Sequence, residues 1–151
     1  MTREEKLEMK KALEQRTMKF AARVFRYLDS LPKAVSSKVI AFQLGKSASS
    51  IGANYREANR AESTDDFVHK MSIALKECSE SHYWLQVLLE LRPSSDNCKV
   101  LFKECDELLR IFQSSDRTSR AKHESSHANK SQSTNRRIDG STNSQVCQMK
   151  K

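Results

Sequence analysis

Apolar residues recur at spacings of three and four along most of the first 112 positions, which is the period of one face of an α-helix. Three interruptions divide the pattern into four stripes: Pro32, the segment around Ser63, and the segment RPSSDN that begins at Arg92. In chain order the stripes are Leu13, Thr17, Phe20, Val24, Leu28 and Leu31; Ile40, Leu44, Ala48, Ile51, Tyr55 and Ala58; Phe67, Met71, Ala74, Cys78, Leu85 and Leu89; and Cys98, Leu101, Cys105, Leu108 and Phe112. The pattern predicts four helices.

Local signals place the ends of these helices. Thr2 and Ser63 are predicted N-caps, and Thr2 is followed by Glu5 in the pattern of a capping box. We expect the first helix to end before Pro32, the second to begin at or next to it, the third to run to about Leu91, and the fourth, the shortest, to end near residue 112. Because short connections make consecutive helices antiparallel, residues 1–112 are predicted to form an all-α, antiparallel up-down-up-down four-helix bundle.

The stretch SASSIGANYREANRAE, residues 47–62, is rich in serine and glycine in its first half, yet the second apolar stripe runs through it. A loop has no reason to keep a helical period, so we predict a helix here. Glycine costs about 1 kcal/mol relative to alanine inside a helix, so a close contact must offset the penalty. The residues that would let another backbone approach, in the bundle or in a neighbouring subunit, are Gly45, Ser49, Gly52 and Ala53.

A polar seam runs along the same helix and faces two carboxylates of the next one. Its residues are Gln43, Ser47, Ser50, Asn54 and Glu57 on the second helix, and Glu77 and Glu80 on the third. Either these groups form a hydrogen-bonded network or subunit interface, or they form a metal or catalytic site. A di-iron bundle needs paired Glu-x-x-His motifs, which residues 1–112 lack, so the network or interface is the favoured interpretation.

The net charge of +8 is concentrated after residue 112. Residues 1–112 hold 19 Lys and Arg against 16 Asp and Glu, whereas residues 113–151 hold 8 against 3. This second segment has no aromatic residue and few apolar ones, which is too little to offset an ordering cost of roughly 1 to 2 kcal/mol per residue. We therefore predict a bundle domain, 1–112, and a disordered, basic, serine-rich tail, 113–151.

No pattern in the chain predicts an enzyme, a cofactor or a metal site. The segment HESSH, residues 123–127, has the form H-E-x-x-H, but no apolar stripe would dock such a helix and a third ligand is not apparent. No phosphate-binding loop or nucleophile–base arrangement is present. The four cysteines lack C-x-x-C spacing, and no apolar stretch is long enough to span a membrane, so we expect a cytoplasmic protein with reduced thiols.

Two segments, QLGKSASSIGANYREANRAES and DFVHKMSIALKECSESHYWLQVLLEL, resemble the four-helix-bundle proteins encoded by intervening sequences in bacterial 23S ribosomal RNA genes. The family pattern Q-L-x-R-S-x-x-S-I-x-x-N-x-x-E is matched by Gln43, Leu44, Ser47, Ser50, Ile51, Asn54 and Glu57. Its third helix is matched by Phe67, Ala74, Glu77, Glu80 and Trp84. Lys46 stands where an arginine is common. The similarity covers roughly residues 17–112.

The resemblance implies a bundle that assembles into a ring, typically a pentamer. It also implies a link to nucleic acid, because one relative is a nucleic-acid-binding accessory to the reverse transcriptase of diversity-generating retroelements. The molecular role of most members is not established.

Basic residues on the predicted helices give the nucleic-acid hypothesis support of their own. Arg16, Lys19, Arg23 and Arg26 form a continuous ridge on the first helix, and Lys46, Arg56 and Arg60 add charge on the second. Four phosphate contacts would give a log–log salt slope of about −3.6, with little base specificity. We therefore expect a non-catalytic homo-oligomer that binds RNA or DNA. The alternative is a protein-assembly or adaptor module whose basic residues are merely solvated.

Overall fold

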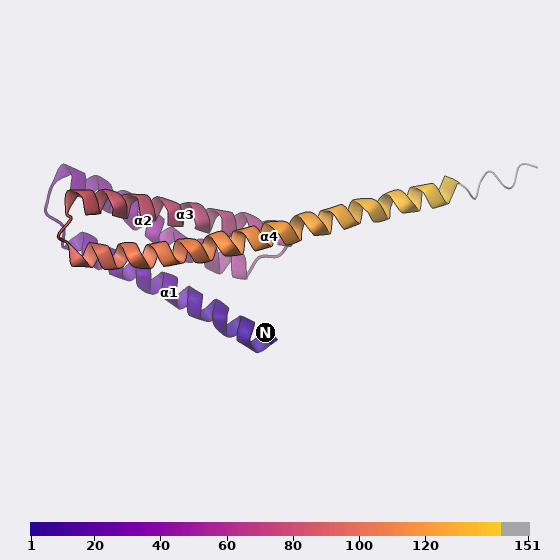
Figure 1. Cartoon of the computed structure of the whole chain (residues 1–151), viewed down its shortest axis with the longest axis horizontal. Helices are drawn as coiled ribbons and strands as arrows, with labels where there is room; N and C mark the ends of the chain where they lie inside the picture. The colour runs from indigo at the N-terminus through magenta and orange to yellow at the C-terminus, as the bar shows by residue number, and fades with distance from the viewer. Residues whose placement is uncertain (143–151) are drawn as a thin grey trace, which may run out of the picture.

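Four helices, packed side by side, make up the described part of the protein (Figure 1). The computed structural model describes residues 1–142, with side chains described for residues 1–126 and 128. The helices are α1 (Arg3–Asp29), α2 (Val35–Asn59), α3 (Thr64–Leu91) and α4 (Asp96–Thr142). Contacts join α1 to α2, α2 to α3, α3 to α4 and α4 back to α1, so the helices enclose one core. The predicted all-α four-helix bundle is confirmed. No helix in the described part of the chain has the length and apolarity to cross a membrane.

The predicted caps are present, and one predicted helix start is wrong. Thr2 and Glu5 form the complete capping box of α1, and the Ser63 side chain accepts from the Asp66 amide at the start of α3. Helix α2 begins at Val35 rather than at Pro32, because Ala34 is extended, with φ −126° and ψ 161°. The Ala34 amide donates to the Pro32 carbonyl at 2.9 Å, which closes a turn before the helix can start.

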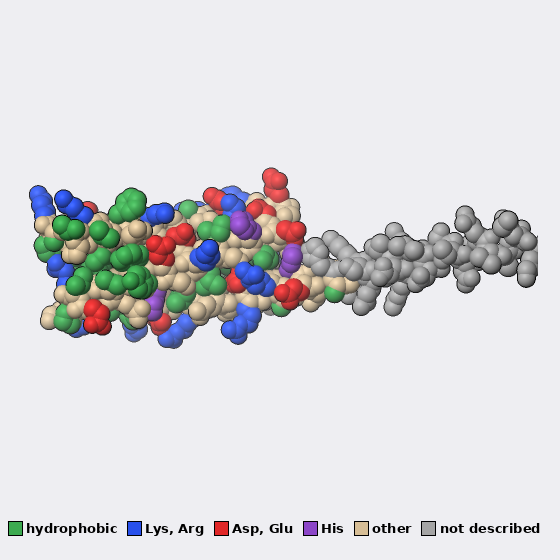
Figure 2. Space-filling view, turned by 90° about the horizontal axis from the view of Figure 1, so that it is seen from above, with side chains coloured by type: hydrophobic (Ala, Val, Ile, Leu, Met, Phe, Trp, Pro, Cys, Tyr) green, Lys and Arg blue, Asp and Glu red, His purple; other side chains and the backbone are tan. Residues whose placement is uncertain are grey.

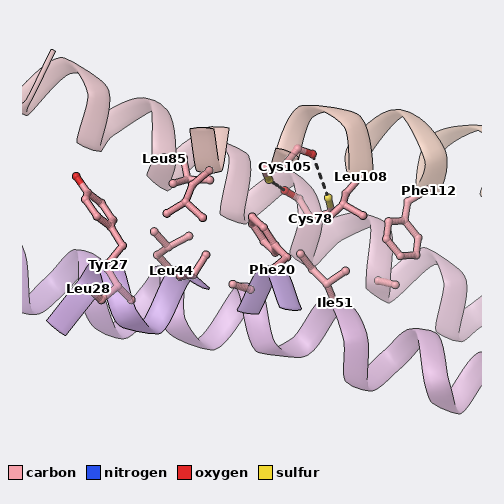
Figure 3. Close-up of a cluster of buried hydrophobic side chains, with 14 of the residues drawn as sticks. Phe20, Tyr27, Leu28, Leu44, Ile51, Cys78, Leu85, Cys105, Leu108 and Phe112 are labelled. Atoms are coloured by element: carbon pink, nitrogen blue, oxygen red, sulfur yellow. Dashed lines mark hydrogen bonds between the residues drawn. The ribbon is translucent and has the colours of Figure 1, made fainter. Parts of the chain in front are cut away.

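The buried core contains residues of all four predicted stripes (Figure 3). Phe20, Leu44, Leu85 and Leu108 are almost completely buried, so each helix contributes to one continuous cluster. Tyr55 and Phe112 pack edge to face at 5.6 Å between ring centres and close the cluster near the C-terminal end of α2. Such burial supplies most of the stability of a helix whose own propensity is modest.

Three cysteines lie in this core as free thiols: Cys78, Cys98 and Cys105. The Cys78 and Cys105 thiols donate to each other's backbone carbonyls, at 3.8 and 3.7 Å (Figure 3). Hydrogen bonding to Cys78 and burial raise the pKa of the Cys105 thiol, so it stays protonated and packs as a small apolar group.

Helix α4 is the longest helix, not the shortest, and the end predicted near residue 112 is too early. Past Phe112 the helix is fixed by polar contacts. Asp116, only 8% exposed, accepts from the Ser72 hydroxyl of α3 and from Arg120 Nε, both at 2.8 Å. His123 contacts Asp65 near the start of α3. A prediction based on the apolar stripe could not reveal that polar contacts continue the helix beyond Phe112. The last part of the predicted tail, residues 143–151, lies outside the described residues.

Candidate functional site

The α1 basic ridge divides into one engaged arginine and three free cations. Arg16 Nε and Nη2 donate to the two carboxylate oxygens of Glu104 on α4, at 2.7 and 3.1 Å. Nη2 also donates to Glu107 at 2.6 Å. Hydrogen bonding to Glu104 is the largest effect that raises the pKa of Arg16. Because a phosphate would have to displace two carboxylates here, Arg16 ties α1 to α4 and is a poor nucleic-acid contact.

Lys19, Arg23 and Arg26 are exposed, and no described carboxylate lies within ion-pair distance of them. At spacings of four and three they share one face of α1. Arg23 and Arg26 line a hollow of about 260 Å³ whose other walls include Asn97 and Leu101 of α4. Lys19 and Arg23 line a second hollow of about 430 Å³, next to the Arg16–Glu104 pair. We call the three residues the α1 cation row; it lies along the α1–α4 groove.

The basic residues predicted on α2 do not join this row. Lys46 is exposed and lies close enough to Glu77 of α3 that its charge partly offsets the rise in the pKa of that carboxyl that burial causes. Arg56 points toward α1, with its Nε 3.8 Å from a carboxylate oxygen of Glu14. Arg60 donates to the Arg56 carbonyl at 3.1 Å. The sequence therefore located the charges, but the fold distributes them over different sides of the bundle.

The small residues predicted for close packing fall into two pairs. Gly45 and Gly52 are buried against α1: a Cβ atom at Gly52 would lie 3.0 Å from Thr17 Oγ1, and one at Gly45 would lie 3.0 Å from the Phe25 ring. Ser49 and Ala53 are exposed, and the Ser49 hydroxyl bonds the carbonyl of Gly45 at 2.9 Å. The glycines thus bring α2 close to α1 within one bundle, while Ser49 and Ala53 leave a flat outer surface.

The polar seam lies between α2 and α3, and only its centre is fully buried. Ser81 Oγ donates to Ser47 Oγ at 2.8 Å, and both residues are 0% exposed. Around this pair the contacts are mostly local or exposed. On α2, Asn54 donates to the Ser50 carbonyl at 2.9 Å, and Gln43 is half-buried. Between the helices, Glu57 forms an ion pair with Lys70 of α3. Within α3, Trp84 Nε1 donates to Glu80 at 3.4 Å. Sequence reasoning missed Ser81 and Lys70, whose spacing from Glu77 on α3 was the available signal.

Glu77 is the member of the seam whose carboxylate is incompletely hydrogen-bonded. One of its carboxylate oxygens is buried without a hydrogen-bond partner among the described atoms. Burial, and to a lesser degree the charge of Glu80, raises the pKa of the Glu77 carboxyl. A second carboxylate nearby is a common feature of metal sites, but no three His, Cys, Asp or Glu side chains within the described residues are grouped to hold an ion. The His123 of the HESSH segment instead contacts Asp65.

The structure also shows an exposed apolar surface at one end of the bundle, which the sequence analysis missed. Val35, Val39 and Phe42 of α2 are 81%, 50% and 69% exposed. Tyr83 and Leu91 of α3 are 55% and 57% exposed. We call these five residues the apolar end patch. Figure 2 shows apolar side chains gathered over this end of the molecule, away from the extension of α4. The three α2 residues lie at helical spacing and could have predicted a second apolar face, but they stand next to the core stripe and were not distinguished from it.

Residues 9–114 match the 23S rRNA-intervening sequence protein family. The chain belongs to this family. It is also similar to the crystal structure of a protein of unknown function from the S23 ribosomal protein family of Bacteroides thetaiotaomicron, with 30% sequence identity and a TM-score of 0.62. That similarity covers 72% of this chain and 97% of the other. No curated protein is significantly similar to the chain.

Family membership accounts for the bundle and leaves part of α4 outside. The match ends at residue 114, just before Asp116 and the polar contacts that fix the continuation of α4. The cation row, the polar seam and the apolar end patch all lie within the matched residues. Neither the family's name nor that of the related structure describes a catalytic activity.

Proposed function

We propose that the protein is a non-catalytic, homo-oligomeric bundle that binds the phosphate backbone of nucleic acid along the α1 cation row. The observation that carries this proposal is the freedom of Lys19, Arg23 and Arg26: all three are exposed, share one helix face and have no carboxylate partner among the described residues. Arg16, which the sequence placed in the same ridge, forms ion pairs with Glu104 and Glu107 and is therefore not available to a phosphate.

Three phosphate contacts make a weak site. At about −0.9 per contact, the log–log salt slope on duplex DNA would be about −2.7 for one bundle. The aromatic side chains of α1 near the row are not placed for base stacking: Tyr27 is 8% exposed, with its hydroxyl hydrogen-bonded to Ser95 at 3.1 Å, and the exposed Phe25 ring lies against Gly45 of α2. Binding should therefore follow the backbone and discriminate little between bases.

An oligomer would convert this weak site into a strong one, because linked copies bind a long polyanion with a high effective concentration. The resemblance to the family suggests a pentamer. The names of the family and of the related structure, which refer to 23S rRNA and to a ribosomal protein family, favour RNA over DNA. The free thiols of the core are consistent with a cytoplasmic location.

The test compares two variants with the same change in charge. One carries Lys19→Glu, Arg23→Glu and Arg26→Glu. The control carries Lys76→Glu, Arg117→Glu and Lys122→Glu, at exposed positions of α3 and α4. Fluorescence anisotropy with unrelated RNA and DNA at low salt should show binding by the wild type and the control, and loss in the first variant, while helicity persists in all three. Equal binding by both variants would overturn the assignment.

The apolar end patch favours a second candidate, an assembly or adaptor module whose cations are only solvated. This candidate expects no binding of RNA or DNA by the wild type at low salt. It also expects assembly to survive both charge-reversal variants. The anisotropy experiment therefore separates the two functions.

A further inference from the structure

The apolar end patch is large for an isolated soluble bundle. Its five side chains are each at least half exposed, and two of them are aromatic rings. Since a large aromatic side chain has an area of roughly 200 Å², the patch is on the order of 500 Å². That is near the upper limit for the largest apolar patch of a typical monomer, and most of the roughly 800 Å² that each partner contributes to a stable interface.

The five residues lie at one end of the bundle. Val35, Val39 and Phe42 occupy the first turns of α2, and Tyr83 and Leu91 occupy the last turns of α3. Because α2 and α3 are consecutive and in contact, these two ends adjoin, as the apolar surface in Figure 2 shows. Trp84 and Val87, close to Tyr83 and Leu91 on α3, are half-buried and pack against the core, so the patch adjoins well-packed side chains.

The outer face of α2 continues the patch as a flat surface. After Val35, Val39 and Phe42, the next exposed positions at helical spacing are Lys46, Ser49 and Ala53. Only Lys46 is charged, and Ser49 has turned its hydroxyl back onto the carbonyls of Gly45 and Lys46. Small side chains with satisfied polar groups let another helix lie close against this face.

We propose that the apolar end patch and the outer face of α2 form the surface by which one copy of this chain contacts another. The inference rests on the homo-oligomeric part of the proposed function and not on its nucleic-acid part. The patch is a permanent feature of the folded bundle, and an apolar patch of this size often marks an interaction site. A second copy of the chain is the partner that is always present in equal amount and always carries helices of matching length.

The experiment measures solution mass by light scattering, at several protein concentrations and without nucleic acid. The wild type should have a mass well above the 17.3 kDa of a single chain. Phe42→Asp, at a position that is 69% exposed, should fold normally but weaken association at least about thirtyfold, as the loss of a central aromatic contact does. The control is Leu7→Asp, at a position that is 51% exposed on α1, and it should keep the wild-type mass.

Every outcome counts for or against the surface. A monomeric wild type, or a Phe42→Asp variant with the wild-type mass and helicity, would overturn it. A monomer whose patch is occupied by a different protein would overturn the choice of a second copy. The variant with Lys19→Glu, Arg23→Glu and Arg26→Glu should keep the wild-type mass, so failure of the nucleic-acid proposal and failure of this one are read separately.

Discussion

The two sides of α2 differ in how their surfaces are used. Toward α1, Gly45 and Gly52 leave so little space that an added Cβ would lie 3.0 Å from a neighbouring atom. On the outer side, Val39 and Phe42 are at least half exposed. The side with the smallest residues is therefore closed by the chain's own α1, and the side with large apolar residues is left open. The comparison teaches that the two glycines mark an internal contact here, whereas exposed large apolar residues mark the external surface.

The largest effect is expected from filling the closed side. Gly52→Leu places a bulky side chain where a Cβ alone would already lie 3.0 Å from Thr17 Oγ1 and 3.4 Å from Thr17 Cβ. Thr17 is 0% exposed and bonds the carbonyls of Leu13 and Glu14, so it cannot move aside cheaply. We expect a loss of about 3 kcal/mol or more in the free energy of unfolding, measured by denaturant titration.

The neighbouring substitution Ala53→Leu is the matched control, because Ala53 is exposed in the single bundle. In protein dilute enough to be monomeric, it should change the free energy of unfolding by no more than about 0.5 kcal/mol. If the two leucines were equally harmful, the difference between the two sides of α2 would be refuted.

A smaller effect should distinguish the two glycines. A Cβ at Gly45 meets the edge of the Phe25 ring, and Phe25 is 46% exposed, so the ring can swing outward. Gly45→Ala should therefore be neutral or gain up to about 1 kcal/mol from helix propensity, whereas Gly52→Ala should lose stability against buried Thr17. The check is a comparison of thermal midpoints, and the reverse order would contradict the packing described.

The Ser47–Ser81 contact, on the side of α2 that faces α3, should contribute less to the free energy of unfolding. Ser81 Oγ donates to Ser47 Oγ in the core, and Ser47 Oγ donates to the Leu44 carbonyl. Ser47→Ala therefore removes the acceptor of the Ser81 hydroxyl, and Ser81→Ala removes the donor to Ser47, so each should cost about 1 kcal/mol. The double variant should cost less than the sum, since neither hydroxyl then remains. A double-mutant cycle measures this coupling, and strict additivity would show that the hydroxyls do not interact.

The smallest effect should come from Glu77. Burial raises the pKa of its carboxyl above the ordinary 4.5 in the folded state, so folding disfavours the charged form. The contribution of Glu77 to stability should therefore be most favourable below the unfolded pKa and be lost as the pH rises through the folded pKa. Glu77→Gln should be slightly more stable than the wild type at neutral pH, since solvent screens this half-buried carboxyl, and the gain should vanish below pH ~4. A gain that is independent of pH would contradict this cause.

The sequence predicted what depends on local periodicity and missed what depends on distant partners. The stripe through Ile51 and Tyr55 was enough to predict a helix across the glycines. The partner of Arg16 lies on a helix 88 residues away, so a charge row read from one helix could not reveal that Arg16 is engaged. The continuation of α4 depends on Ser72 and Asp116, which carry no apolar signal.

The exposure of Val39 and Phe42 shows the same limit in another form. They adjoin the core stripe on α2, and helical spacing does not tell how wide an arc of a helix its neighbours will cover. The packing positions of α1 and α3 decide how wide an arc of α2 is buried, and only the fold determines these positions.

Covalent footprinting of side chains across a range of protein concentrations tests the difference between the closed and open sides of α2 most directly. Phe20 and Phe112, almost completely buried, should resist labelling at every concentration, and Leu7 should be labelled at every concentration. Phe42 and Val39 should be labelled in dilute protein and become protected as copies associate. Labelling of Phe42 that stays constant through the rise in solution mass would contradict the assignment of the open side as the surface between copies.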